Sequence, residues 1–139
     1  MDLDPTNKRL LALLQEDARL SAAELGRRVG LSRPAVQGRI QAMERAGILR
    51  GYHAEISGAG LIEAVILMTI AERPCDRALQ WLRGQEGVTS VLSLAGEIDA
   101  LARVTVPDPA ALSALGDRIL ASGLIASAKT HVVLRRYGG

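Results

Sequence analysis

The sequence is poor in cysteine and histidine, and these shortages exclude several kinds of site. Its 139 residues include one cysteine, Cys75, and two histidines, His53 and His131. A single cysteine cannot form an intramolecular disulfide framework, and by itself it cannot build a tetrahedral zinc site. We interpret Cys75 as an unreactive thiol and expect no metal and no cofactor. Because no nucleophile–base pair is visible, we also expect no catalytic residue and no enzymatic activity.

The sequence also lacks a long hydrophobic run. Its most apolar stretch, AVILMTIA at residues 64–71, is short of the roughly 18 apolar residues that indicate a membrane-spanning helix. The amino-terminal stretch MDLDPTNKRL is polar and acidic, unlike a secretory signal. We therefore predict a cytoplasmic protein with no membrane partner.

Positive charge is concentrated in one part of a nearly neutral chain. The formal net charge is +2, but residues 1–53 carry nine Lys or Arg against six Asp or Glu. Within residues 27–50, six arginines are accompanied by one acid, Glu44. Such a patch indicates a polyanionic partner, although a solvated surface could have the same composition.

Two helices are predicted before this patch. Asp4 followed by Pro5 is typical of a helix start, and leucines at helical spacing supply its buried side up to about Asp17. The sequence SAAE at residues 21–24 predicts a capping box, in which the Ser hydroxyl and the Glu carboxylate both accept from amides at the helix start. Gly30 is placed to end this second helix.

A third helix follows after a short break. Ser32 is its expected cap, and it should reach Ala46. Helix, short break and helix is the layout of a helix-turn-helix. The expected core positions fall at helical spacing and are Leu25, Val29, Leu31, Val36, Ile40 and Met43.

The outward side of the third helix presents glutamines between arginines. Glutamine can pair with the adenine edge and arginine with guanine in the major groove, while flanking arginines reach phosphates. Gly38 costs about 1 kcal/mol of helix propensity relative to Ala, which suggests a close approach to the duplex. The candidate DNA-binding residues are Arg27, Arg28, Ser32, Arg33, Pro34, Gln37, Gly38, Arg39, Gln41, Arg45 and Arg50. A helical hairpin with a solvated face is the alternative.

The second half has β-branched and aliphatic runs separated by turn residues. Strand, helix, strand, strand, helix, strand is the order predicted, which is the ferredoxin-like arrangement of an α+β fold. The expected ranges are 63–72, 76–84, 87–96, 98–106, 109–123 and 125–137, with only Gly96 and Glu97 between the two central strands. We expect a DNA-binding domain at residues 1–50, a linker at 51–62 and a second domain at 63–139.

Apolar residues occupy both faces of the predicted strands, so helices on one face leave the other in need of cover. We expect a second copy of the sheet to cover it and form a homodimer. Two-fold symmetry would place two recognition helices on successive major grooves about 34 to 36 Å apart.

The segment LAGEIDAL, residues 94–101, is the main polar feature of the second half and is called the hairpin corner below. Gly96 permits a positive φ, and Glu97 and Asp99 place two carboxylates in one short turn. Such a corner could bind an ammonium group with its acids and a carboxylate with its amides. A solvated turn would have the same composition.

Both halves of the sequence resemble the Lrp/AsnC family of feast/famine regulators. The resemblance covers essentially the whole chain. Its matching stretches are LDPTNKRLLALLQEDARLSAAELGRRVGLS, RIQAME, GILRGYHAEI, LAGEIDALARVTVPD and KTHVVL.

The resemblance implies a winged helix-turn-helix joined to an amino-acid-sensing βαββαβ domain, with dimers assembling to higher oligomers, an octamer being expected. It also implies effector contacts by Gly96, Glu97, Asp99 and Thr130. The chain departs from the family pattern at Asn7, where Asp is usual, at Arg33, and at Ala128, where Thr is common.

The function predicted is a transcriptional regulator that binds specific double-stranded DNA and responds to an amino acid or related metabolite. One alternative is an architectural DNA-binding protein without an effector. Another is a relative of the haem-pathway decarboxylases, which would need histidines and basic residues around a tetrapyrrole.

Overall fold

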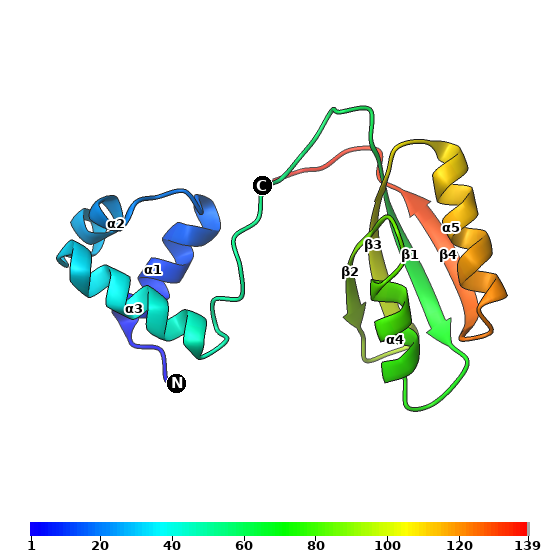
Figure 1. The fold of residues 1–139 in the computed structure, drawn as a ribbon, viewed down its shortest axis with the longest axis horizontal. Coiled ribbons are helices and arrows are strands. Elements are labelled where there is room, and N and C mark those ends of the chain that lie inside the picture. Colours follow the sequence, from blue (N-terminus) through cyan, green and yellow to red (C-terminus); the bar gives the residue numbers. More distant parts are fainter. Residues whose placement is uncertain (139) are drawn as a thin grey trace. The chain divides into compact units, whose positions relative to one another are not determined.

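The computed structural model describes residues 1–138, which form two compact units, residues 1–55 and 56–138 (Figure 1). The boundary between the two units, after Glu55, falls within the predicted linker at residues 51–62. Gly139, the last residue of the predicted second domain, lies outside the described residues. No helix within residues 1–138 is long and apolar enough to span a membrane.

The first unit consists of three helices, α1 (Pro5–Glu16), α2 (Ala22–Val29) and α3 (Arg33–Arg45). Each begins at a side chain that accepts a hydrogen bond from a main-chain amide in the first turn: Asp4 from Asn7 at 2.7 Å, Ser21 from Glu24 at 3.1 Å, and Ser32 from Ala35 at 3.3 Å. The break between α2 and α3 comprises residues 30–32. The predicted helix-turn-helix is therefore confirmed.

The turn between α2 and α3 is held by a close main-chain contact at Gly26. The Leu31 amide donates to the Gly26 carbonyl at 2.9 Å, and Gly30 takes the left-handed conformation with φ of 74°. A Cβ at Gly26 would lie 2.4 Å from the Leu31 oxygen, so only glycine fits. This contact lets α3 pack on α2, and the core of the unit is Leu10, Leu13, Leu14, Leu25, Val36 and Met43.

No wing follows α3. Residues 46–61 form turns and extended chain, and the first strand within residues 1–138 begins at Ile62. The Tyr52 hydroxyl instead donates to the Glu44 carboxylate at 2.7 Å, which ties the start of the linker to α3. Burial and the neighbouring carboxylate raise the pKa of Tyr52 to about 12. The winged form implied by the family resemblance is thus replaced by an extended segment.

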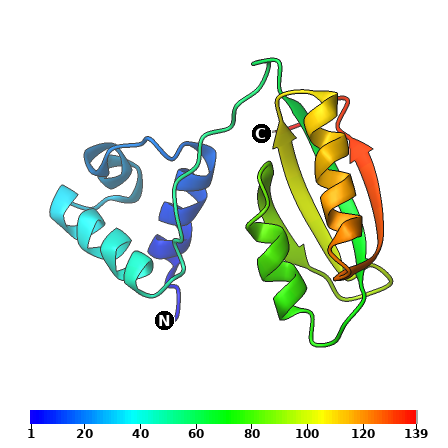
Figure 2. The same ribbon diagram turned by 45° about the vertical axis from the view of Figure 1, so that its right-hand side comes forward.

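The second unit has a four-stranded antiparallel sheet with two helices on one face (Figure 2). Its elements are β1 (Ile62–Ile70), α4 (Asp76–Arg83), β2 (Val88–Ser93), β3 (Ala100–Val106), α5 (Pro109–Ala121) and β4 (Ile125–Val132). The strand order β2-β3-β1-β4 is that of the predicted ferredoxin-like fold. The α+β class and the order of the six elements are confirmed.

The hairpin between β2 and β3 differs from the prediction. Its loop comprises residues 94–99 instead of Gly96 and Glu97 alone. The loop is closed by the Leu94 amide, which donates to the Asp99 carbonyl at 2.9 Å, while the Asp99 amide donates to Met68 of β1 at 3.0 Å. Because of these bonds, residues 94–99 do not take part in the strand pairing between β2 and β3. The last strand also ends earlier than predicted, at Val132.

The two faces of the sheet differ in how they are covered. Side chains that face α4 and α5 are buried, among them Ile66 and Met68 of β1, together with Leu115 of α5. The opposite face is called the open face below. Its central apolar side chains are Val65, Leu67, Leu92 and Leu101, and Leu92 remains 50% exposed.

Gly26→Ala should destabilise the first unit by about 2 kcal/mol or more, because its new methyl group would overlap the Leu31 carbonyl. Gly38→Ala is the matched control, since a Cβ at Gly38 meets no atom within 4 Å and alanine favours a helix by about 0.5 to 1 kcal/mol. Urea unfolding followed by helical circular dichroism would measure both. Equal stability of the two variants would contradict the role given to Gly26.

Candidate DNA-binding interface and effector site

The outward face of α3 consists of exposed side chains. Gln37, Gln41 and Arg45 are exposed, whereas Val36 and Met43 on the inner face are buried. Arg33 and Pro34 lie in the first turn, next to the Ser32 cap. Within residues 1–138, Gln37, Gln41 and Arg45 make no side-chain hydrogen bond or ion pair, so their polar groups are available to a ligand.

Gly38 lies on this same exposed face. A Cβ at this position would meet nothing within 4 Å, so packing inside the unit does not require glycine. Since alanine would favour the helix, no contact within residues 1–138 accounts for the cost of glycine at this position. The close approach of DNA at Gly38 stays a prediction.

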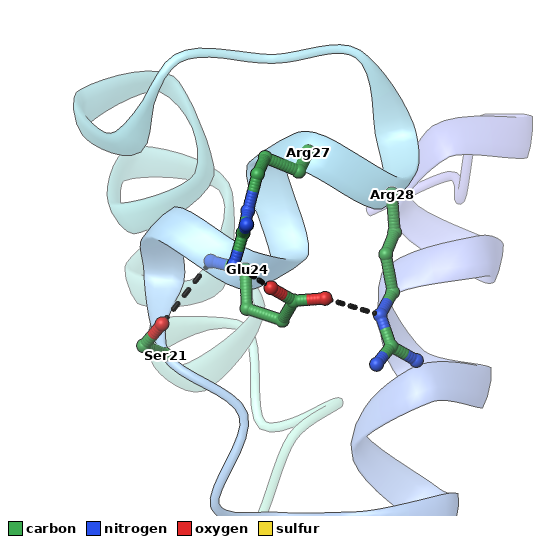
Figure 3. Close-up of polar contacts among 4 residues, drawn as sticks. All are labelled: Ser21, Glu24, Arg27 and Arg28. Carbon is green, nitrogen blue, oxygen red and sulfur yellow. Dashed lines mark hydrogen bonds and ion pairs between the residues drawn. The ribbon is translucent and has the colours of Figure 1, made fainter.

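Arg27 and Arg28 of α2 are paired with Glu24, as Figure 3 shows. The Arg28 Nε donates to the Glu24 carboxylate at 2.9 Å, and Arg27 forms a second ion pair with the same carboxylate. The predicted capping box is therefore only half formed. Ser21 caps α2, but the Glu24 carboxylate accepts from the two arginines, because they follow it at helical spacing.

Arg39 of α3 is directed to α1. Its Nη1 donates to the Asp4 carboxylate at 2.7 Å and to the Asn7 side-chain oxygen at 3.0 Å. This contact holds α3 against the start of α1, so Arg39 has a positioning role besides the phosphate contact predicted for it. The Arg39 guanidinium and the Asn7 amide lower the pKa of Asp4 below its ordinary value.

The predicted cationic patch thus contains two kinds of arginine. Arg33, Arg45 and Arg50 are exposed and unpaired within residues 1–138, whereas Arg27, Arg28 and Arg39 have acidic partners. Glu24 and Asp4 precede residues 27–50, so the charge pattern of that window did not reveal them. Helical spacing could have indicated the Glu24 pairs, but nothing local connects Asp4 with Arg39, 35 residues away.

Asp99 of the hairpin corner is engaged inside the unit. Its carboxylate accepts from the Ile70 amide at 2.8 Å and from Arg73 at 2.6 Å, and its side chain is only 13% exposed. The Ile70 amide and Arg73 hold the pKa of Asp99 below its usual value. Asp99 therefore fixes the corner to the end of β1. Arg73 was not among the predicted site residues.

The other predicted effector residues lie in different places. Gly96 has a φ of 135°, as its position in the turn suggested, and Glu97 is exposed in the same loop. Thr130 pairs with Ile66 on the far side of β1 from β3, so the fold does not bring it to the corner within one chain. No cluster of three or more His, Cys, Asp or Glu that could hold a metal is present within residues 1–138.

Comparison with known proteins assigns both units. Residues 3–44 match the AsnC-type helix-turn-helix domain, and residues 63–138 match the Lrp/AsnC ligand binding domain. The chain belongs to the Lrp/AsnC family. It is therefore a helix-turn-helix transcriptional regulator whose second unit is of the ligand-binding type.

Individual Lrp/AsnC relatives match along nearly the whole chain. An HTH-type transcriptional regulator of Mycobacterium tuberculosis is 33% identical over 137 residues, covering 95% of this chain and 92% of that protein. The leucine-responsive regulatory protein of Escherichia coli is 29% identical over 140 residues, covering 96% and 85%. The structure of a Neisseria meningitidis regulator in complex with L-Met has a TM-score of 0.81 at 30% identity, covering 99% and 94%.

The Asp4–Arg39 ion pair should make the stability of the first unit depend on acid pH. Because the folded-state pKa of Asp4 lies below its ordinary value of 3.8, this contribution is present above that value and is lost as pH falls through the lower one. Asp4→Asn, which keeps a capping side chain, should lower the unfolding temperature at about pH 6, and the difference from the wild type should shrink as pH falls progressively below 3.8. Asp2→Asn is the charge-matched control. A constant difference across this range would contradict the ion pair.

Proposed function

We propose that this regulator binds specific duplex DNA by placing the outer face of α3 in the major groove. The observation that carries the proposal is the unpaired amide face of Gln37 and Gln41, flanked by Arg33 and Arg45, on the second helix of a helix-turn-helix. Glutamine amides can distinguish base edges, and arginines can bind guanine or phosphate.

Each predicted DNA-binding residue receives a role in this proposal. Ser32 and Pro34 start α3, and Gly38 allows the helix to come close to the duplex. Arg39 positions α3 through Asp4, while Arg27, Arg28 and Arg50 lie near phosphates. The first helix of a helix-turn-helix crosses the DNA backbone, which fits the arginines of α2.

A homodimer is part of the proposal, because one helix-turn-helix reads only one half-site. The open face supports it: apolar Val65, Leu67, Leu92 and Leu101 form the centre of a sheet face that no helix of the same unit covers. A second copy of the same face would bury them. We further propose that dimers assemble to an octamer. Sedimentation showing only monomers at micromolar concentration would contradict both statements.

We also propose that an amino acid or a related metabolite controls DNA binding through the second unit. Two observations on relatives support this: one is named leucine-responsive, and another was solved with L-Met. In this chain, Glu97 and the loop amides beside Gly96 would contact the ligand. Asp99 would fix the loop, and Thr130 would contribute from β4 of another subunit. An effector acts only by its different affinity for alternative assemblies.

Two other functions are weaker. An architectural protein would wrap DNA without a small-molecule response. A haem-pathway enzyme would need histidines around a tetrapyrrole, but His53 is an exposed residue of the linker and His131 lies on β4 in the other unit. We propose that the protein has no catalytic activity and acts in the cytoplasm. Titration of sirohaem with the protein should leave the absorption spectrum of sirohaem unchanged. A shift of that spectrum would support the enzymatic alternative.

Gln37→Ala should change the preference of the protein among DNA sites, because the side chain is proposed to read a base edge. Loss of one such contact should cost about 1 to 3 kcal/mol at the site that uses it and little elsewhere. Fluorescence anisotropy with the protein's own promoter fragment and unrelated duplexes would measure this. Gln15→Ala, an exposed glutamine on α1, is the matched control. Failure of the wild-type protein to bind any duplex at low salt would refute the proposed interface.

Glu97→Gln should weaken the response to an effector without lowering stability, since Glu97 is exposed and has no ion-pair partner within residues 1–138. The test is a mobility-shift assay on the promoter fragment with each of the twenty amino acids. Glu86→Gln, an exposed acid before β2, is the control. If no amino acid alters the wild-type complex, the architectural alternative is favoured. If one does and Glu97→Gln responds normally, the corner is not the effector site.

A further inference from the structure

Glu24 lies at the centre of the cationic side of α2. Its carboxylate is bound by Arg28 Nε at 2.9 Å and by Arg27, while its own side chain is 28% exposed (Figure 3). Arg27 and Arg28 follow Glu24 by three and four residues, so the three side chains lie side by side along one flank of α2, whereas Leu25 is buried. We call Glu24, Arg27 and Arg28 the Glu24 cluster. On a helix that crosses the DNA backbone, this cluster would face phosphates.

The charges of the Glu24 cluster have opposite effects on a phosphate. Arg27 is 77% exposed and Arg28 44% exposed, so both guanidiniums can reach an anion in solution. Each must leave or share the Glu24 carboxylate to do so. Exposed ion pairs are weak, and therefore phosphates can compete for the arginines, but the remaining carboxylate repels the same phosphates.

We propose that Glu24 limits the affinity of this protein for the DNA backbone by competing with phosphates for Arg27 and Arg28. Because phosphates carry the same charge at every sequence, Glu24 weakens operator and non-operator binding by the same factor. The preference for operator over other DNA sequences would then depend on the uncharged amides of α3. It also reduces the fraction of protein held at the many non-specific sites of a genome. This inference depends on the DNA interface proposed above.

The test compares Glu24→Gln with Glu16→Gln, an exposed acid at the end of α1 that changes the net charge of the same unit equally. Anisotropy titrations would use an operator fragment and an unrelated duplex of equal length at several salt concentrations. Glu24→Gln should tighten both complexes about 3- to 10-fold and steepen the salt dependence by up to about one unit. The ratio of the two affinities should stay constant, and Glu16→Gln should change binding less than about 2-fold.

A second comparison shows whether Glu24 acts through its arginines. In a background of Arg27→Gln and Arg28→Gln, the added Glu24→Gln substitution should tighten binding much less than in the wild type, because only the direct repulsion between the carboxylate and phosphates is then removed; a double-mutant cycle would measure the difference. Glu24→Ala, which preserves helix propensity, should behave like Glu24→Gln and replaces it if that variant unfolds.

The contradicting results are distinct. The inference is overturned if Glu24→Gln binds like the wild type, if Glu16→Gln tightens binding as much, or if the effect is undiminished without Arg27 and Arg28. A wild-type protein that binds no duplex would overturn the DNA interface as well. Normal wild-type binding without a Glu24 effect would overturn this inference alone.

Discussion

The close packing of α3 against α2 and α1 is the constraint on which the DNA-binding unit depends. It requires a main-chain contact at the turn, where Gly26 leaves room for the Leu31 carbonyl, and a side-chain contact at the other end of the interface, where Arg39 reaches Asp4 and Asn7. Between them, Val36 and Met43 are fully buried. A helix fixed at several points along its inner face presents its outer face in a defined orientation, as recognition of base edges requires.

The first unit has fewer unpaired arginines than its composition suggests. Half of the arginines in the predicted patch are paired with acids, and the acids belong to the same three helices. Arg39 acts between helices, and Arg27 and Arg28 act within one. The arginines that remain unpaired lie at α3 and after it. In the proposed interface, base reading and phosphate attraction are thus separated, since the amide face of α3 is uncharged while the side chains around it are cationic.

The hairpin corner follows a similar principle in the second unit. Asp99 uses both carboxylate oxygens for internal contacts, to the Ile70 amide and to Arg73, and so holds the loop to β1. Glu97 and the loop main chain are left exposed. The side chains of β1 and β3 alternate between a covered face and the open face, and within residues 56–138 no helix covers the open face. A ligand site and a subunit contact can therefore occupy different parts of the same small fold.

The sequence by itself determined the helices of the first unit, their caps, the order of the six elements of the second unit and the family. These follow from local patterns: a capping side chain before each of the three helices, glycine after α2, and alternating apolar residues in strands. The role expected for Gly96 also came from the chain, because only a glycine takes its φ of 135° readily.

Only the tertiary structure decided which charged side chains are free. The Asp4–Arg39 pair joins residues 35 positions apart, and Asp99–Arg73 joins two loops, so no local spacing indicates either one. The same holds for Gly26, because only the folded turn shows that the Leu31 carbonyl occupies the space that a side chain at this position would need. The longer hairpin loop has the same origin, since the hydrogen bond from the Asp99 amide to Met68 of β1 competes with the strand pairing that local propensity favoured.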